Sequence, residues 1–313
     1  MLLLALAWPG SPALAQTPGS VSGGPFKGKP LHITETRAEQ VARTDSALSG
    51  TDRARIAWLG RIPQATWLTG GTPASAARLV ATEQAGARAT GTVSQLVIYD
   101  LPHRDCGSAS AGGVRAAASY KSYVQAIAAS LGRAPAIVVL EPDSLANAGC
   151  LSKADYAQRM ALERYAVARL GARPGVAVYL DGGNHGWQSP RTMAQRLVRA
   201  GIVDARGFAL NVSNFDSTQS ETDYGLQISR LVGWKRFVID TSRNGAGTQD
   251  AWCNPPDAAV GSLPGAATLS PAVDALLWVK HPGESDGRCG ASQAGAGAFD
   301  PTLALSMMSK AGR

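Results

Sequence analysis

The chain has 313 residues, which is enough for one large domain with a substantial buried core. Hydrophobic residues make up 45% of the sequence and charged residues 17%, a composition that excludes a disordered polyelectrolyte and a bundle of membrane helices. The net charge of +7 is spread along the chain without a dense basic run, and we find no zinc-finger or RNA-binding motif. We therefore expect a globular protein with a solvated basic surface and no nucleic-acid partner.

The N-terminal residues have the pattern of a secretory signal peptide, because a short apolar run ends at Ala13-Leu-Ala15. This run is too short to span a bilayer, so we expect export and no membrane partner. A stretch rich in Gly, Ser and Pro follows it. We expect a signal peptide over residues 1–15, a flexible lead-in over residues 16–45 and a single domain over residues 46–313, secreted as a monomer.

The four cysteines have neither the Cys-x-x-Cys spacing nor the accompanying His pair of a zinc site. In an exported protein they indicate two disulfides, and several pairings are possible. The simplest pairing joins sequence neighbours, Cys106 to Cys150 and Cys253 to Cys289, and closes loops of roughly 40 residues. We expect no metal ion and no cofactor.

Short apolar runs alternate with amphipathic, Ala-rich stretches along most of the chain. The apolar runs are typical of strands that are buried on both faces of a parallel sheet, and they predict strands at residues 65–68, 96–99, 136–140, 176–180, 207–211, 237–240 and 275–279. The Ala-rich stretches predict helices at residues 114–132, 153–171 and 189–200. Such repetition predicts an α/β barrel or a doubly wound sheet.

Polar side chains follow the end of almost every predicted strand. In chain order they include Asp100, Asp105, Glu141, Asp143, Asp181, His185, Asn211, Asp240, Arg243, Lys280, Glu284 and Asp286. In a barrel these carboxyl ends form the catalytic face. A doubly wound sheet more often carries a Gly-rich phosphate-binding turn, and neither nucleotide-binding Gly motif is present. The pattern therefore favours a barrel.

Carboxylates and tryptophans at one face of a barrel point to the cleavage of polysaccharides. Hydrolysis of a glycosidic bond needs a protonated carboxyl that donates to the leaving oxygen and a second group that activates water. A carboxyl stays protonated near neutral pH only if it is desolvated or lies beside another negative charge. Trp67, Trp187 and Trp252 lie near strand ends, where an indole can stack on a sugar ring, whereas we expect Trp278 to lie in the core.

Taken singly, these signals have simpler explanations. An Asp after a strand is more often a helix cap or a turn residue than a catalyst, and we expect that role for Asp155 and Asp204. Asp143 by itself also fits a cap, and His185 either contacts substrate or packs locally.

Longer strings resemble the motifs of glycoside hydrolase family 6, a family of endoglucanases and cellobiohydrolases. They are Tyr99-Asp-Leu-Pro-His-Arg-Asp105-Cys106, Leu140-Glu-Pro-Asp143-Ser-Leu-Ala-Asn147, Tyr179-Leu-Asp181-Gly-Gly-Asn-His-Gly-Trp187, Asn211-Val-Ser-Asn214 and Trp278-Val-Lys280-His-Pro-Gly-Glu284-Ser-Asp286-Gly. The resemblance runs in order over about residues 50–305. It implies a distorted (β/α) barrel with about seven parallel strands, a cleft at their C-terminal ends, hydrolysis of β-1,4-glucan chains with inversion, and the neighbour pairing of the disulfides.

The resemblance also implies roles for single residues. Asp143 would be the general acid, and Asp105 the neighbouring carboxyl that keeps it protonated. Asp286 is the candidate base, with a water chain towards Asp105 as its rival. We expect Arg288 to place a positive charge beside Asp286 and to keep it ionised.

The remaining matched positions imply contacts with substrate. Tyr99 would crowd the sugar at the cleavage point, Asp181 would tune the site, and three tryptophans would stack on sugar rings: Trp67, Trp187 and Trp252. Hydroxyl contacts are implied for Lys280 and Glu284, and His185 and Asn211 are further candidates for substrate binding. Many family members have His at the position of Asn184, so the place of His185 is a departure from the pattern.

Endo or exo action depends on the loops that roof the site. Only seven residues separate Asn244 from Trp252, which is little material for a tunnel. We therefore expect an open cleft and cutting of internal bonds. The alternatives are a cellobiohydrolase that works from chain ends and a glucan-binding protein without catalysis.

Overall fold

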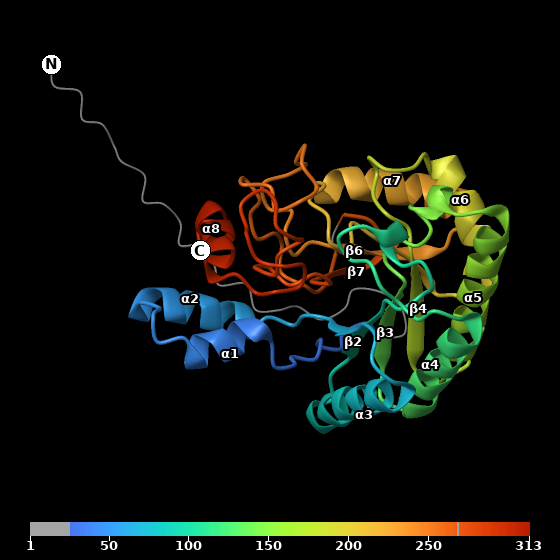
Figure 1. The fold of residues 1–313 in the computed structure, drawn as a ribbon, viewed down its shortest axis with the longest axis horizontal. Coiled ribbons are helices and arrows are strands. Elements are labelled where there is room, and N and C mark those ends of the chain that lie inside the picture. Colours follow the sequence, from blue (N-terminus) through green and yellow to red (C-terminus); the bar gives the residue numbers. More distant parts are fainter. Residues whose placement is uncertain (1–25, 268) are drawn as a thin grey trace, which may run out of the picture.

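The computed structural model describes residues 26–267 and 269–313. One sheet of seven parallel strands runs in chain order: β1 (Thr66–Leu68), β2 (Ser94–Ile98), β3 (Ala136–Leu140), β4 (Val176–Asp181), β5 (Gly207–Leu210), β6 (Arg236–Asp240) and β7 (Val273–Leu277). Helices fill the first five connections: α3 (Pro73–Thr90), α4 (Ala117–Ser130), α5 (Lys153–Gly171), α6 (Pro190–Arg199) and α7 (Thr218–Leu231). Figure 1 shows these helices wrapped around the outside of the curled sheet.

Both faces of the sheet are buried, which explains the continuous apolar runs. Leu96 and Ile98 of β2 pack in the core against the outer helices, whereas Val97 and the following Tyr99 point into the barrel interior. Because side chains alternate along a strand, neighbouring strands in register line the same two cores. The interior core is a continuous apolar floor beneath the C-terminal strand ends.

No strand ladder joins β1 to β7 among the described residues, so the sheet alone would be a half-barrel. Three hydrogen bonds cross this seam instead. The Ala65 N–H donates to the Trp278 carbonyl at 3.0 Å, and the Trp67 Nε1–H donates to the Val279 carbonyl at 2.8 Å. His281 Nε2 lies 2.7 Å from the Ala65 carbonyl. These bonds bring the two edges of the sheet together as a distorted barrel, in agreement with the predicted fold.

The first two helices correct the prediction for the N-terminal region. Helix α1 (Arg37–Thr44) lies inside the range 16–45 for which we predicted a flexible lead-in. It begins at the Thr36 cap and packs with α2 (Gly50–Gly60) and α8 (Pro301–Lys310) around a separate apolar cluster. Leu31, which is 4% exposed, forms a bridge with Val93. This region was misjudged because its few apolar residues bury themselves against distant parts of the chain.

The predicted strands are all present, and β2 and β7 each begin two residues earlier than predicted. The predicted helices at 114–132, 153–171 and 189–200 correspond to α4, α5 and α6. Trp278 is fully buried in the core, as predicted. Asp155 lies in the first turn of α5, whose cap is Ser152.

None of the described helices combines the length and hydropathy that crossing a membrane requires. The predicted signal peptide lies outside the described residues.

Candidate active site

Carboxylates at the strand ends hold the surrounding loops by accepting backbone N–H groups. Glu141, which follows β3, accepts from Asp100 and Leu101 at 3.0–3.1 Å. Asp181 of β4 accepts from Asp143 at 3.1 Å and from Gly183 at 3.0 Å. Each carboxylate thus links its own strand end to the loop after the preceding strand. A buried carboxyl group needs hydrogen-bond partners, and these N–H donors in turn fix the loop backbone.

Asp240 accepts backbone N–H groups from more residues than Glu141 or Asp181 does. It accepts N–H groups from Ser213, Ser242, Val279 and Lys280 at 2.9–3.2 Å. It therefore ties together the loops that follow β5, β6 and β7. Burial nevertheless raises its pKa, and the N–H donors oppose that rise.

A cleft of about 620 Å³ opens above these anchored loops. It is lined by nine of the twelve predicted catalytic and substrate-binding residues: Trp67, Tyr99, Asp105, Asp143, His185, Trp187, Trp252, Lys280 and Asp286. A hollow of this size suits a ligand of several rings. Trp252 is 62% exposed and Trp187 is 36% exposed, so two indoles present open faces to the cleft.

Asp143 sits in the loop after β3 in a left-handed backbone conformation with φ of 67°. Its own N–H is held by Asp181, and its Oδ2 accepts the Tyr99 hydroxyl at 3.2 Å. Burial, followed by the charge of Asp105, raises the pKa of Asp143 to about 7, whereas the Tyr99 hydrogen bond lowers it. The site therefore contains a carboxyl that holds its proton near neutral pH.

Asp105 lies in a short 3-10 turn beside the disulfide that joins Cys106 to Cys150. Its Oδ2 accepts the Ser110 N–H at 2.8 Å, and its Oδ1 has only a long contact of 3.5 Å with Asn147. One carboxylate oxygen is therefore largely free on the cleft wall. Asp105 and Cys106 both have positive φ values near 50°, a strained backbone of the kind that clusters at functional sites.

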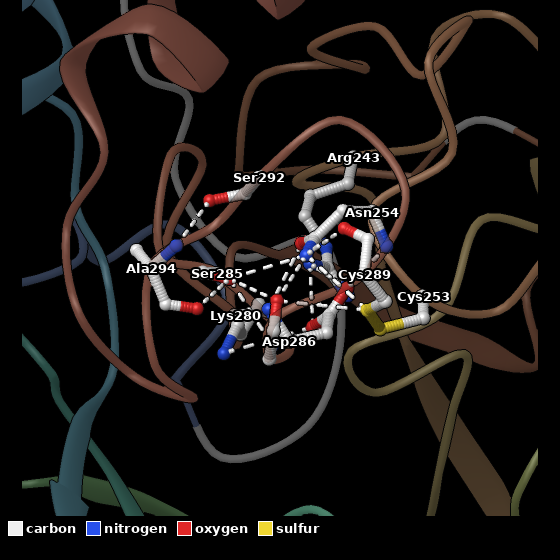
Figure 2. Close-up of a disulfide and its surroundings, with 10 residues drawn as sticks. Arg243, Cys253, Asn254, Lys280, Ser285, Asp286, Cys289, Ser292 and Ala294 are labelled. Atoms are coloured by element: carbon white, nitrogen blue, oxygen red, sulfur yellow. Dashed lines mark hydrogen bonds and ion pairs between the residues drawn. A yellow bond between two sulfur atoms is a disulfide. The ribbon is translucent and has the colours of Figure 1, made fainter.

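Asp286 is held by an ion pair that the sequence analysis missed. Arg243 Nη1 lies 2.8 Å and 2.9 Å from its two carboxylate oxygens, and the pair is almost fully buried. Figure 2 shows Arg243, Asn254 and Lys280 converging on Asp286 beside the Cys253–Cys289 disulfide. The prediction that Arg288 supplies the positive charge is wrong. Arg243 reaches Asp286 from the loop after β6, a contact that depends on the curl of the sheet.

Asn254 also holds Asp286 in place, although no sequence motif singled it out. Its side-chain oxygen accepts the Asp286 N–H at 2.9 Å, and its backbone N–H donates to Asp286 Oδ2 at 3.2 Å. Its amide nitrogen also donates to the carbonyls of Gly287 and Cys289. The residue next to a disulfide cysteine thus sets the position of a candidate catalytic carboxylate.

The structure separates three predicted substrate contacts from this cleft. Asn211 is fully buried, and its amide nitrogen donates to the carbonyls of Asp216 and Asp240. Asp181 is 1% exposed and acts on the Asp143 backbone. Glu284 faces a second hollow, where it is paired with His281 at 3.0 Å. Polar residues at strand ends were predicted as one set, but only tertiary packing decides which of them face the cleft.

His185 lines the cleft, although its ring is held by neighbouring acids. The ring Nδ1 lies 3.1 Å from a Glu221 carboxylate oxygen and 3.4 Å from an Asp216 carboxylate oxygen. The backbone N–H of His185 also donates to Glu221. These three side chains form the group of described residues whose ligand atoms are close enough to hold a metal ion. In the structure they bond to one another, which positions the imidazole at the cleft edge.

The barrel, the acid-lined cleft and the exposed indoles define a hydrolase of the carbohydrate-cleaving class. Comparison with known proteins agrees: the family model described as "Glycosyl hydrolases family 6" matches residues 26–312. The chain belongs to this family, and both disulfides pair as the family resemblance implied.

Similar proteins include enzymes of both action types. The chain is 43% identical to Endoglucanase A of Cellulomonas fimi over 267 residues, which cover 85% of the chain and 58% of that protein. It is 32% identical to Exoglucanase 3 of Agaricus bisporus over 86% of the chain and 70% of that protein. The structure of endoglucanase Cel6 from Mycobacterium tuberculosis, in complex with a thio-linked cellobioside, superposes with a TM-score of 0.87 at 41% identity, covering 91% of this chain and 98% of that one. The chain thus spans less than two thirds of the Cellulomonas protein but nearly the whole of the solved Mycobacterium chain.

Proposed function

We propose that the protein is a secreted endo-β-1,4-glucanase that cuts internal bonds of glucan chains with inversion. The observation that carries this proposal is Asp143, a cleft carboxyl with a pKa of about 7 beside Tyr99 and Asp105. Asp143 gives its proton to the glycosidic oxygen as the carbon–oxygen bond breaks. A water molecule attacks the anomeric carbon from the opposite face, and its proton passes to a base.

Tyr99 helps to fix the acid and shapes the sugar site. Its hydroxyl donates to Asp143 Oδ2, which leaves Oδ1 as the oxygen that carries the transferable proton. Its ring packs edge-on against Trp67, with centroids 5.7 Å apart. In our proposal the rings of Tyr99 and Trp67 crowd the sugar at the cleavage point. Lys280, Trp187 and Trp252 contact the glucan on either side of it.

The proton acceptor is better sought at Asp105 than at Asp286. Both oxygens of Asp286 are engaged by Arg243, and Asn254 and Lys280 lie at 3.2 Å and 3.9 Å. An ion-paired carboxylate with occupied lone pairs is a poor base. Asp105 has a largely free oxygen on the cleft wall. We therefore propose that Asp105 receives the proton through water and that Asp286 and Arg243 anchor the site.

Removing the acid tests the main assignment. Asp143→Asn should lower kcat on cello-oligosaccharides about 10²–10⁴-fold, because the leaving oxygen is no longer protonated. The loss should be much smaller on an aryl cellobioside with a good leaving group, which needs little protonation. Steady-state kinetics on both substrates check this. Equal losses on the two substrates would show that Asp143 has a role other than acid catalysis.

If Asp286 holds the site together and is not the base, its removal should reduce stability. Asp286→Asn should lower the free energy of unfolding by on the order of 3–5 kcal/mol, because it leaves the buried Arg243 without its partner. The double variant Asp286→Asn with Arg243→Gln should recover much of that loss, since no charge is then left unpaired. Denaturant unfolding measures both. A stable but inactive Asp286→Asn enzyme would instead identify Asp286 as the base.

The open cleft favours internal cutting over action from chain ends. Gln249, Asp250 and Ala251 form a short wall segment, and Trp252 beside them remains largely exposed. On soluble carboxymethyl cellulose we expect viscosity to fall steeply for few reducing ends released. A slow fall in viscosity relative to reducing ends would favour the cellobiohydrolase alternative. Secretion is supported by two disulfides, which persist in oxidising compartments.

A further inference from the structure

A cluster of three ionisable side chains lies at the edge of the cleft, and the mechanism proposed above uses none of them. It consists of His185 from the loop after β4, Asp216 from the loop after β5, and Glu221 in the first turn of α7. His185 and Asp216 line the cleft, whereas Glu221 is fully buried. The cluster thus combines an imidazole nitrogen with two carboxylates, which are donors that transition-metal ions bind in proteins.

The distances within the cluster are close to those of a tetrahedral metal site. His185 Nδ1 lies 3.1 Å from Glu221 Oε1 and 3.4 Å from Asp216 Oδ1. Ligand atoms at about 2.0–2.1 Å from a tetrahedral zinc ion are about 3.3 Å from one another. The ligand atoms of all three side chains lie within 4.8 Å of one another, so small rotations of the carboxylates allow one ion to contact all three.

The buried carboxylate of Glu221 is a second observation that points to a cation. Its side chain is 0% exposed, and its Oε2 has no hydrogen-bond partner among the described residues. Its Oε1 accepts the backbone N–H of His185 at 2.9 Å and faces the imidazole, so the carboxylate points into the cluster. Within the described part of the chain, neither Glu221 nor Asp216 forms an ion pair with Lys or Arg. A bound cation would supply the positive partner that a buried carboxylate needs.

Neighbouring amides hold Asp216 in position. The Asn211 side-chain oxygen accepts the Asp216 N–H at 3.0 Å, and the Asn211 amide nitrogen donates to the Asp216 carbonyl at 3.1 Å. The Asn244 amide nitrogen donates to the same carbonyl at 2.9 Å. Supporting hydrogen bonds of this kind orient the ligands of metal sites.

The other histidines of the chain lack this arrangement. His103 and His281 each face one carboxylate, and His32 faces the Thr92 hydroxyl. Among the described residues, His185 is the histidine with two carboxylates at one ring nitrogen. The spacing of Cys and His in the sequence gave no reason to expect a metal ion, because the three donors come from separate elements that only the fold brings together.

We propose that His185, Asp216 and Glu221 bind a zinc ion or a similar divalent transition-metal ion, with a further ligand position open to the cleft. One nitrogen and two oxygen donors favour Zn²⁺ over Ca²⁺, which takes roughly six to eight oxygen ligands, and over Mg²⁺, which keeps several of its waters. The ion would join the loop after β4 to α7 and so fix the loop that carries Trp187. This inference goes beyond the proposed function, and no step of the proposed hydrolysis depends on it.

The test titrates ZnCl₂ into the full chain, purified without a histidine tag and freed of metal with EDTA. Calorimetry should show one zinc ion bound per chain, and Tm should rise with zinc concentration, because the folded state alone holds the three donors together. Asp216→Asn and His185→Gln should each weaken zinc binding at least about 100-fold, the upper end of what the loss of an outer-shell partner costs. Both side chains reach the surface, so these variants should still fold, which circular dichroism checks.

His103→Asn is the matched control. It removes an exposed imidazole 3.7 Å from Asp155, and Asn tolerates the left-handed backbone at this position, where φ is 57°. Zinc affinity should be unchanged in this variant. No zinc binding by the wild-type chain, equal affinity in Asp216→Asn, or equally tight binding of CaCl₂ would overturn the inference. Because the titrations contain no glucan, they give the same answer whether or not the proposed function holds.

Discussion

At the scale of single residues, the chemistry depends on how burial and neighbouring charges act on one carboxyl. Asp143 lies in a partly buried pocket near Asp105, and both burial and the negative neighbour disfavour its ionised form. Tyr99 opposes them by donating to the carboxylate. These opposing contacts predict opposite shifts of the pH profile when each is removed.

The pH dependence follows from the raised pKa of Asp143. Because the acid must be protonated, kcat/KM should fall as pH rises through about 7. Asp105→Asn removes a neighbouring negative charge, so the fall should move to lower pH. Tyr99→Phe removes a donor that favours the carboxylate, so the fall should move to higher pH. Profiles of kcat/KM for the three enzymes check these directions, and shifts of the same sign in both variants would contradict the assignment.

The same group makes stability depend on pH with a defined sign. The pKa of Asp143 in the folded protein, about 7, lies above the ordinary value of 3.8. The protonated carboxyl therefore contributes stability that is fully present below the ordinary value and is lost as pH rises through about 7. In the proposed mechanism, the raised pKa keeps the acid protonated for catalysis at a cost in stability at alkaline pH.

At the scale of elements, short loops are held by contacts from neighbouring strands rather than by their own sequence. Asp240 joins three loops, Glu141 holds the loop after β2, and the disulfides tie the Asp105 and Asp286 loops to their surroundings. Asp105 directly precedes Cys106, and Asp286 lies three residues before Cys289, so each candidate catalytic side chain is close to a disulfide. These contacts fix the positions of the loops that carry the candidate catalytic side chains.

The disulfides give a prediction at this scale. Each closes a loop of 36 or 44 residues, for which the chain-entropy model gives about 4 kcal/mol of stabilisation. Replacing Cys253 and Cys289 together by Ser should lower the free energy of unfolding by about that amount. It should also lower kcat, because Asn254 loses the constraint that places it against Asp286. Denaturant unfolding and kinetics measure the two effects, and an unchanged unfolding midpoint would contradict the prediction.

The elements were well predicted where local pattern decides them. Continuous apolar runs identified the strands because both faces of the sheet are buried. Helix α1 was missed because only two of its side chains, Ala38 and Ala42, are buried. They pack in an apolar cluster with α2, which follows α1, and with α8 at the other end of the described chain. The exposed residues of α1 then proved to line a hollow, a role that no periodicity indicates.

At the scale of the whole molecule, the curl of the sheet assembles the site. The seam bonds at Ala65, Trp67 and His281 bring the loop after β7 against β1. Lys280 and Asp286 thereby face the same cleft as Tyr99 and Asp143, although more than 130 residues separate the two pairs. An open sheet with the same strand order would leave the two pairs several strands apart, because Tyr99 and Asp143 follow β2 and β3 whereas Lys280 and Asp286 follow β7.

The sequence by itself indicated the family, the places of the strands and the candidate acid, because motif strings and buried strands are local features of the chain. Tertiary structure alone decided that Arg243 and not Arg288 pairs with Asp286, that Asn211 is buried, and that Glu284 faces the second hollow. The physical reason is that ion pairing, burial and cavity shape depend on distances between segments far apart in the chain. The sheet sets those distances only after it curls and its edges meet.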